Sequence, residues 1–382
     1  MARPLVLFVA PRNNLYGASR SMLDLVRGLP SRGFDVHVAL QTPGPLGPLL
    51  DESGISWTPI RTHRWIGAPR GPLRRLRNRL LDSKTARQVG TLARWQDAVL
   101  VHTNTLSSPV GALIAKEAGL PHVWHMREAV DTEPGSVFSE GMEAARRFID
   151  AHTDRVFCVS DALAEETARY ADRSKIRRLH NGPLPAEIPP LFDREPIDLD
   201  GEIWLLSVGA IGPRKGQEQA IRATAMLRKN GLDARLTLAG DGGKEVVEGM
   251  RSLARSLGIE SSVEFPGFVD PKPLYRSSHV SLVCGPRDPL PRVAIESLAQ
   301  GIPTVALRSG GIPEIVDDGE TGWLYDGAPE ELAAAVERAV RTPSQELKEM
   351  RAEGHRRVYE RFNMERYRDD CVRLYAEMGI VP

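Results

Sequence analysis

The sequence predicts an α/β protein built from two doubly wound, Rossmann-like domains, and three observations lead to this prediction. The chain has 382 residues, which exceeds the ~100–200 residues usual for one domain. Short apolar runs alternate with amphipathic helical patterns, as in βαβ units that form parallel sheets. A proline-rich stretch interrupts this alternation near the middle of the chain, and the alternation then begins again.

The N-terminal half supplies the first domain, which we place at residues 1–185. Strands are expected at five apolar runs, residues 5–9, 36–40, 98–102, 121–125 and 155–159. After the first run, apolar residues recur at helical spacing, which predicts an amphipathic helix packed on the sheet. The first run is too short for the apolar core of a signal peptide, so it is predicted to be a buried strand.

A linker is expected at residues 186–201, because five prolines between residues 183 and 196 disfavour both helix and central strand. The second domain follows at residues 202–360. Its strands are expected at residues 203–209, 235–240, 263–265, 279–283 and 303–306, with a helix at about 217–230. Residues 344–378 are predicted to be helical with a break near Phe362 and Asn363.

The composition excludes several classes of protein. Fifty basic residues balance fifty acidic ones, so a globally basic nucleic-acid-binding protein is not expected. The three cysteines, Cys158, Cys284 and Cys371, lie far apart and form neither a metal-ligand pair nor a disulfide framework. No stretch reaches the ~20 apolar residues of a membrane span. We therefore expect a soluble, cytoplasmic protein without a nucleic-acid partner.

Glycines follow the first strand of each half, and ligands of open α/β sheets bind beyond the carboxyl ends of strands. Gly17 stands at the entry to the first long helix, where a phosphate can approach backbone N–H groups; a plain turn glycine is the alternative. In the second half, Gly209 opens a loop that carries Arg214 and Lys215, two cations able to neutralise a diphosphate. The loop matches neither the P-loop nor the dinucleotide fingerprint.

The segment of residues 285–322 carries the strongest signal. Asp288 and Glu296 are acids eight positions apart, one before a predicted helix and one in its early turns. An acid in the first turn of a helix can simply compensate the helix dipole, whereas an acid that faces a cleft can accept both hydroxyls of a ribose. Glycines recur through the rest of the segment, at positions 301, 310, 311, 319 and 322.

The run of residues 288–322 resembles the donor-binding signature of retaining glycosyltransferases of the GT-B type, in particular glycosyltransferase family 4. The resemblance extends in family order over nearly the whole chain, through residues 267–269, 239–242, 209–216, 181–182, 159–160, His125 and Gly17. It implies two domains facing an interdomain cleft, with a C-terminal helix at residues 361–382 that returns to the N-terminal domain. The implied activity is hexosyl transfer from a nucleoside-diphosphate sugar to an acceptor hydroxyl, with retention of configuration.

The resemblance also implies roles for individual residues. Lys215 would pair with the donor diphosphate, Glu296 would hold the nucleotide ribose, and Asp288 would contact the hydroxyls of the donor sugar. The remaining implied contacts are Gly209 and Arg214 in the loop, Leu290, Arg292 and Val293 near the phosphates, Phe268 and Val269 beside the base, and Gly17 and His125 from the N-terminal domain, with His125 near the transferred sugar.

Three positions depart from the family pattern. Ala210 stands where the family has arginine, so that one phosphate contact is either lost or supplied by Arg214 or Arg287. Asp288 replaces a glutamate and is one methylene shorter, which can alter the choice of sugar. Pro291 stands where glycine is common, and proline has no N–H to donate.

The chemistry is expected to need no metal and no cofactor beyond the nucleotide sugar. Asp198 and Asp200 match the Asp-x-Asp motif of metal-dependent sugar transferases, but they lie beside the linker, where aspartates favour turns. His122 and His125 would point to opposite faces of a strand. Cations and helix N-termini would instead stabilise the departing diphosphate. The resemblance implies front-face attack, and the lack of a carboxylate pair suited to double displacement agrees with this.

Residues 70–81 form a strongly basic segment. It contains four leucines and Arg70, Arg74, Arg75, Arg77 and Arg79, with no acid before Asp82. Such a helix can lie on an anionic membrane, with the nearby Trp65 at the interface. The alternative is a helix whose leucines pack on the core while its arginines face water. Peripheral membrane contact would indicate a lipid-linked glycan or another membrane-borne alcohol as acceptor.

Two alternative functions share the predicted fold. A nucleotide-sugar 2-epimerase has the same two domains, and a protein of this fold can bind nucleotide sugar without catalysing transfer. An NAD-dependent oxidoreductase is not expected, because no Gly-x-Gly-x-x-Gly sequence opens a helix. Arg127 has two possible partners of its own, the acceptor or its neighbour Glu128.

Overall fold

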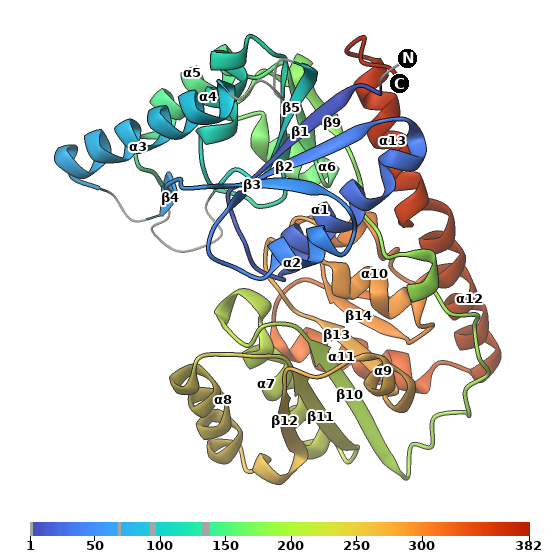
Figure 1. Cartoon of the computed structure of the whole chain (residues 1–382). Helices are drawn as coiled ribbons and strands as arrows, with labels where there is room; N and C mark the ends of the chain where they lie inside the picture. Colours follow the sequence, from blue (N-terminus) through green and yellow to red (C-terminus); the bar gives the residue numbers. More distant parts are fainter. Residues whose placement is uncertain (1–2, 68–69, 92–96, 131–136) are drawn as a thin grey trace. The chain divides into compact units, whose positions relative to one another are not determined.

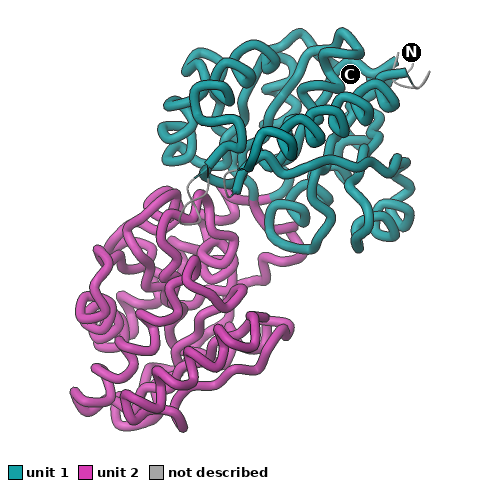
Figure 2. Tube along the Cα trace, turned by 90° about the vertical axis from the view of Figure 1, so that its left-hand side faces the viewer, with its two compact units in different colours: residues 1–181, 364–382 teal, residues 182–363 magenta. Residues whose placement is uncertain are grey.

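The computed structural model describes residues 3–67, 70–91, 97–130 and 137–382, and it divides the chain into two compact units. Unit 1 comprises Met1–Asn181 and Met364–Pro382, and unit 2 comprises Gly182–Asn363 (Figure 2). The chain therefore passes between the units twice, after Asn181 and after Asn363. These crossings lie side by side, since a Cβ atom on Gly182 would be 1.8 Å from the backbone oxygen of Phe362.

The described residues of unit 1 form a seven-stranded sheet with the order β3-β2-β1-β5-β6-β8-β9. Neighbouring strands pair in parallel throughout. The central strands are buried along nearly their whole length, as expected for a sheet covered by helices on both sides. β1 is apolar throughout, whereas β5 and β6 also carry buried polar side chains such as His102 and His125. The strands are β1 (Leu5–Ala10), β2 (Asp35–Gln41), β3 (Ser56–Ile60), β5 (Ala98–Asn104), β6 (His122–Met126), β8 (Arg155–Cys158) and β9 (Ile176–Arg178).

Helices cover both faces of this sheet (Figure 1). On one face, His102 and Phe157 contact Tyr375 of α13. On the other face, Trp124 stacks on Trp65, which also contacts the α5 residue Phe148. The helices are α1 (Gly17–Gly28), α2 (Leu46–Asp51), α3 (Pro72–Gly90), α4 (Val110–Ala118), α5 (Met142–His152), α6 (Asp161–Thr167) and α13 (Met364–Ala376), and β4 (Ile66–Gly67) pairs with β7 (Val137–Phe138) as a small antiparallel ribbon.

Unit 2 repeats this architecture with a six-stranded parallel sheet among its described residues, in the order β12-β11-β10-β13-β14-β15. The strands are β10 (Glu202–Val208), β11 (Asp233–Ala239), β12 (Val263–Gly267), β13 (Val280–Val283), β14 (Thr304–Leu307) and β15 (Trp323–Tyr325). Helix α7 packs with α8 and α11, and α10 packs with α12. The helices are α7 (Gln217–Lys229), α8 (Lys244–Ser256), α9 (Lys272–Ser277), α10 (Arg292–Ala299), α11 (Pro329–Arg341) and α12 (Ser344–Arg361). The predicted α/β fold with two parallel-sheet domains is therefore confirmed.

The proline-rich segment of residues 186–201, which we expected to link the domains, lies within unit 2. Its carbonyl groups accept hydrogen bonds from unit 2: Arg351 donates to Phe192 at 2.7 Å, and a ring nitrogen of His355 lies 2.9 Å from the Pro189 oxygen. Arg194 in turn donates to the Ser278 oxygen at 2.6 Å. Prolines prevent regular structure here but leave carbonyl acceptors, so the segment packs on unit 2 and the crossing occurs earlier, at Asn181.

The predicted strands and helices correspond to observed ones, with differences at short elements. Five described strands were not predicted, namely β3, β4, β7, β9 and β15, which have only 2 to 5 residues each. β3 contains Pro59 and lies at a sheet edge, where proline is tolerated. The C-terminal helix breaks at Phe362 and Asn363, between α12 and α13. α13 belongs to unit 1, where Arg32 pairs with Glu365 at 2.8 Å.

Candidate active site

The strand orders place one topological switch point in each sheet, and ligands of open α/β sheets bind at the carboxyl ends of strands there. In unit 1 this point lies between β1 and β5, and in unit 2 it lies between β10 and β13. Among the described residues, Thr105 (φ 72°) and Arg287 (φ 56°) are the non-glycine residues with positive φ. Each follows the strand beside its switch point. Such strained backbone concentrates at functional sites. In each unit, therefore, the candidate site lies at the carboxyl ends of the strands of its own sheet.

The unit 2 edge is built from loops that touch through their backbones. Gly216 has φ 66°, and a Cβ atom there would lie 2.1 Å from the Cys284 oxygen. Gly310 has φ 57°, and its Cβ atom would lie 2.2 Å from the Asp288 oxygen. Only glycine permits these approaches. The glycines of the predicted signature therefore bring the loops after β10, β13 and β14 together, which places their side chains in one small region.

Lys215 and Asp288 meet at this edge. Lys215 ends the short helix η5 (Pro213–Lys215), and its Nζ atom lies 2.6 Å from Oδ2 of Asp288. The two side chains are 31% and 18% exposed. The sequence predicted separate contacts for them, to the diphosphate and to the sugar, and the structure joins them in one ion pair. Because the pair is partly exposed, an anionic ligand can replace the carboxylate as partner of the ammonium group without uncovering a buried charge.

The second acid, Glu296, lies on α10 beside Arg292. Their side chains are 3.3 Å apart (Nε to Oε1) and mostly shielded from solvent, and Arg292 also lies 3.8 Å from the Glu187 carboxylate. Leu290 is buried, and Val293 is half-buried on the same helix. Glu296 thus has an arginine partner in this structure, while its partial exposure leaves room for a ribose hydroxyl.

The remaining unit 2 residues lie around this cluster with greater exposure. Phe268 and Val269 follow β12 and are 81% and 40% exposed. A phenyl ring that projects into solvent is free to stack on a base, in line with the implied role. Gly209 has φ 138°, and Arg214 is exposed in η5. Ala210 presents its carbonyl to Gln217, which donates to it at 3.1 Å.

In unit 1, Gly17 is exposed at the first position of α1. The Asn14 side-chain oxygen accepts hydrogen bonds from the Tyr16 N–H and the Ser19 hydroxyl, both at 3.1 Å. The first turn of α1 contains no acid, and Tyr16 is 71% exposed. The positive end of this helix therefore retains its attraction for an anion.

His125 and Arg127 lie together on one face of β6, but both are buried. His125 is 0% exposed and Arg127 is 8% exposed. Arg127 donates from Nε to Asn104 at 2.6 Å and from Nη2 to the Tyr367 hydroxyl at 2.5 Å. The charge of Arg127 also acts on its expected partner Glu128, and the alternative contact with the acceptor stays a prediction. Burial and the nearby Arg127 charge hold the pKa of His125 well below its usual value, so its ring is neutral.

Sequence reasoning missed three residues at the same edge, Arg12, Thr105 and Glu128. Burial raises the pKa of Glu128, while Arg12, Arg127 and a hydrogen bond from Thr105 act against this rise. Glu128 Oε1 and Arg12 Nε are buried without a hydrogen-bond partner among the described residues. Arg12 and Thr105 directly follow β1 and β5, so their position after predicted strands was the signal that could have identified them.

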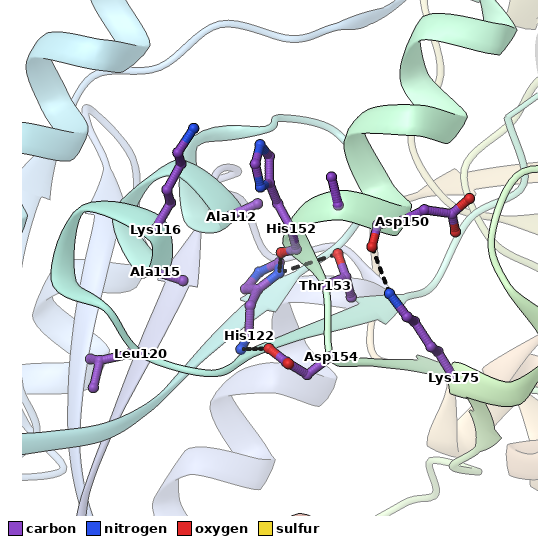
Figure 3. A pocket seen from close by; sticks show the side chains of 11 residues that line it. Ala112, Ala115, Lys116, Leu120, His122, Asp150, His152, Thr153, Asp154 and Lys175 are labelled. Atoms are coloured by element: carbon purple, nitrogen blue, oxygen red, sulfur yellow. Dashed lines mark hydrogen bonds between the residues drawn. The ribbon is translucent and has the colours of Figure 1, made fainter.

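A polar hollow of about 270 Å³ lies at the opposite edge of the unit 1 sheet (Figure 3). It is lined by the start of β6 at His122, by the end of α5, and by Lys116 and Lys175. His122 is bonded to Thr103 and to the His152 carbonyl, and burial lowers its pKa to about 3. Since ligands of parallel sheets bind at carboxyl ends, this hollow is not the candidate active site.

The basic segment forms the first turns of α3. Leu73, Leu76 and Leu80 are 84%, 55% and 60% exposed, so the alternative in which these leucines pack on the core is wrong. The expectation of uncompensated charge is also wrong in part, because Arg79 lies 2.7 Å from Glu140 and Arg75 lies 4.0 Å from it. Arg74 and Arg77 are exposed.

Trp65, expected at a membrane interface, is buried. It is 4% exposed, stacks on Trp124 and donates from its indole to the Leu106 carbonyl. Among the described residues, no group of three or more His, Cys, Asp or Glu side chains is arranged to hold a metal ion. The Asp198 carboxylate accepts the Asp200 N–H at 3.0 Å, which is a turn contact.

Two family models match consecutive parts of the chain. Residues 16–183 match "Glycosyltransferase Family 4" and residues 192–357 match "Glycosyl transferases group 1". A D-inositol 3-phosphate glycosyltransferase of Rhodococcus erythropolis is 31% identical over 304 residues, which are 74% of this chain and 68% of that protein. The chain therefore belongs to the glycosyltransferase family that these models and this relative represent. The family predicted from residues 288–322 is therefore confirmed.

Other relatives are matched over shorter parts of their length. The lipopolysaccharide core biosynthesis glycosyltransferase LpsE of Rhizobium meliloti is 31% identical over 229 residues, 59% of this chain and 65% of that protein. An uncharacterized glycosyltransferase of Methanocaldococcus jannaschii is 29% identical over 248 residues, 60% of this chain and 63% of that protein. The chain thus spans less than two thirds of the length of these two relatives.

Solved structures support the fold of this glycosyltransferase. The Anabaena protein HepE in complex with UDP and glucose matches with a TM-score of 0.76 and 21% identity, over 97% of this chain and 99% of that one. Within the residues that the model describes, no helix is both long enough and apolar enough to cross a bilayer.

Proposed function

We propose that the protein transfers a sugar from a nucleoside-diphosphate sugar to an acceptor hydroxyl, with retention of configuration and without a metal. The observation that carries this proposal is the Lys215–Asp288 ion pair at the switch point of unit 2. It combines a cation for the departing diphosphate with a carboxylate that can accept hydrogen bonds from sugar hydroxyls.

Bond cleavage at the sugar builds negative charge on the leaving phosphate oxygen. A fixed ammonium group and helix N-termini stabilise this charge more in the transition state than in the ground state, which lowers the barrier. Lys215 would supply the ammonium group. For retention, the acceptor would attack from the face that the diphosphate leaves, and the phosphate oxygen would take the proton of the acceptor.

Turnover tests the reaction directly. The full-length protein is screened against nucleotide sugars, including UDP-glucose, by thermal stabilisation, because ligand binding raises apparent stability by mass action. The stabilising sugar is then incubated with the protein and the released nucleoside diphosphate is measured. Release with a retained anomeric centre in the product supports the proposal. Binding without release would instead indicate a non-catalytic protein, and a rearranged nucleotide sugar would indicate an epimerase.

The absence of a metal requirement is tested in the same assay. EDTA is expected to leave the rate unchanged, because Lys215 and helix N-termini would carry the charge stabilisation. A complete loss of activity that manganese or magnesium restores would contradict this part of the proposal and would implicate carboxylates such as Asp198.

We further propose that the first turns of α3 bind an anionic membrane surface, which presents the acceptor. Leu73, Leu76 and Leu80 lie at helical spacing on one side and are largely exposed. Arg74 and Arg77 are exposed beside them. Burial and then the nearby charges of Arg74 and Arg64 lower the pKa of Arg70, so guanidinium groups gather here. Exposed leucines flanked by arginines suit a surface with acidic headgroups above an apolar layer.

Vesicle sedimentation tests the membrane contact. Changing Arg74, Arg75, Arg77 and Arg79 to glutamine should weaken binding to anionic vesicles at least 100-fold, since each arginine contributes about 1 kcal/mol at such a surface. Salt should weaken wild-type binding as well. A matched control changes four arginines of unit 2 whose side chains are 42 to 57% exposed, Arg222, Arg255, Arg308 and Arg356, to glutamine. Equal loss in both variants, or no binding by the wild type, would contradict the contact while leaving donor turnover untouched.

A further inference from the structure

A chain of buried polar side chains joins the C-terminal helix to β6 in unit 1. The Tyr375 hydroxyl on α13 lies 2.6 Å from Nδ1 of His102 on β5. Nε2 of His102 lies 3.1 Å from Nδ1 of His125 on β6. All three side chains are fully buried. α13 was expected only to return to the N-terminal domain. These hydrogen bonds link it directly to the candidate site residue His125.

Arg127 at one end and the Tyr375 hydroxyl at the other together set the direction of these hydrogen bonds. Its Nη2 atom lies 3.5 Å from Nδ1 of His125, and a guanidinium group only donates. Nδ1 of His125 must therefore be an acceptor. Arg127 itself is held by the Tyr367 hydroxyl of α13, at 2.5 Å, and by the Asn104 side chain, at 2.6 Å.

Once Nδ1 of His125 is the acceptor, the positions of the other protons can be deduced. Burial and the charge of Arg127 hold the pKa of His102 and His125 well below its usual value, so both rings are neutral. A neutral imidazole has one donor and one acceptor nitrogen. His102 must donate from Nε2 to His125, so it accepts at Nδ1 from the Tyr375 hydroxyl. Cys371, one turn earlier on α13, also hydrogen-bonds Tyr375, and its thiol can donate to the phenol oxygen.

This series of hydrogen bonds ends at a donor without a partner among the described residues. With Nδ1 accepting, the proton of His125 is on Nε2. This nitrogen and Nη1 of Arg127 are buried and have no hydrogen-bond partner among the described residues. A buried donor without a partner is unfavourable, so an incoming oxygen acceptor would stabilise both groups. The two residues share one face of β6 at the carboxyl edge where ligands of this fold bind.

We propose that Tyr375 and Tyr367 are positioning residues of the active site: through His102 and Arg127 they hold His125 as the Nε2–H tautomer, a hydrogen-bond donor for an oxygen atom of the bound substrate. The substrate part of this proposal rests on the proposed function. The tautomer part depends only on the buried contacts of unit 1. The C-terminal helix thus contributes to chemistry through side chains that touch no substrate.

Nitrogen-15 NMR of the histidines in the full-length protein tests the tautomer without any ligand. The His125 ring should show a protonated Nε2 and an unprotonated Nδ1. Tyr375→Phe removes the hydroxyl that donates to His102, so the two His102 nitrogens and then those of His125 should move towards averaged shifts. Tyr170→Phe is the matched control, since Tyr170 is also a buried tyrosine of unit 1 and its hydroxyl lies 3.2 Å from the Thr167 hydroxyl, outside this network.

Kinetics test the link to substrate. With the sugar donor found in the thermal screen, Tyr375→Phe and Tyr367→Phe should each lower kcat about tenfold with little change in KM, while Tyr170→Phe should leave both unchanged. A protonated Nδ1 on His125 in the wild type would overturn the proposal, as would an unchanged tautomer and kcat in Tyr375→Phe. If no donor is turned over at all, the proposed function fails, and the NMR result still decides the tautomer.

Discussion

Unit 1 and unit 2 contain the same kind of parallel sheet, yet the polar groups at the carboxyl ends of their strands differ in kind. In unit 2, Lys215 and Asp288 are partly exposed and stand on loops that glycines bring together. In unit 1, His125 and Arg127 are buried in a network that includes α13. A partly exposed ion pair can exchange a partner for a ligand charge, whereas a buried network fixes orientation and tautomer. We infer that unit 2 is suited to bind charge and unit 1 to orient.

The largest effect is expected from removing the unit 2 cation. Lys215→Ala should lower kcat about 100- to 1,000-fold, the usual result of deleting one stabilising group at a developing charge. Released nucleoside diphosphate measures this loss. Lys229→Ala, at the exposed end of α7, is the control and should keep full activity. Full activity in Lys215→Ala would show that unit 2 does not stabilise the departing diphosphate through this lysine.

The glycine-based packing of unit 2 is tested by Gly216→Ala. The added methyl group would lie 2.1 Å from the Cys284 oxygen, at a residue with φ 66°, so unfolding free energy should fall by at least about 2 kcal/mol. Urea denaturation of the full chain measures it. Gly249→Ala in α8, where nothing lies within 4 Å of the added Cβ atom, should be neutral or stabilise by up to about 1 kcal/mol. Equal stability of both variants would contradict the packing argument.

Because of its buried histidines, unit 1 should lose more folding stability than unit 2 as the pH falls. The pKa values of His102, His122 and His125 lie below the unfolded value of 6.5. Their stabilising contribution is therefore complete above pH 6.5 and is lost as the pH falls towards the folded values, because the unfolded chain binds more protons. Each histidine adds up to about 1.4 kcal/mol per pH unit to this loss.

Hydrogen exchange of the full-length protein, corrected for the intrinsic rate, follows this loss between pH 7 and pH 5 in each unit. In unit 2, burial also lowers the pKa of His279, so a smaller change is expected there. If the two units lost protection equally, the buried histidines would not be the cause.

The smallest effect is expected at Glu296. Glu296→Gln should weaken binding of the nucleoside diphosphate about tenfold, since an amide accepts hydrogen bonds at one oxygen where the carboxylate accepts at two. Calorimetry measures the affinity, and Glu245→Gln on the exposed first turn of α8 serves as control. Unchanged affinity in Glu296→Gln would leave Arg292 as its only demonstrated partner at this position.

Much of the fold was readable from local pattern. Apolar runs such as residues 5–9 predicted central strands correctly because buried parallel strands are apolar on both faces. β3 and β15 were missed because short edge strands carry little pattern of their own. The position of the crossing was also misjudged: prolines 183–196 showed where regular structure stops, but the carbonyl acceptors that hold this segment on unit 2 belong to distant residues such as Arg351.

For the candidate site, the sequence by itself determined the family, the glycine-containing loops and the acids at Asp288 and Glu296, because these lie at fixed spacings along one chain segment. Only the tertiary structure decided which groups meet. The Lys215–Asp288 pair joins residues 73 positions apart, and the His102–Tyr375 contact joins residues 273 positions apart. Burial decided the rest, since no local pattern distinguishes an arginine that faces solvent, such as Arg77, from a buried one, such as Arg127. The charge of Arg127 is held inside unit 1 by the side chains of Asn104 and Tyr367.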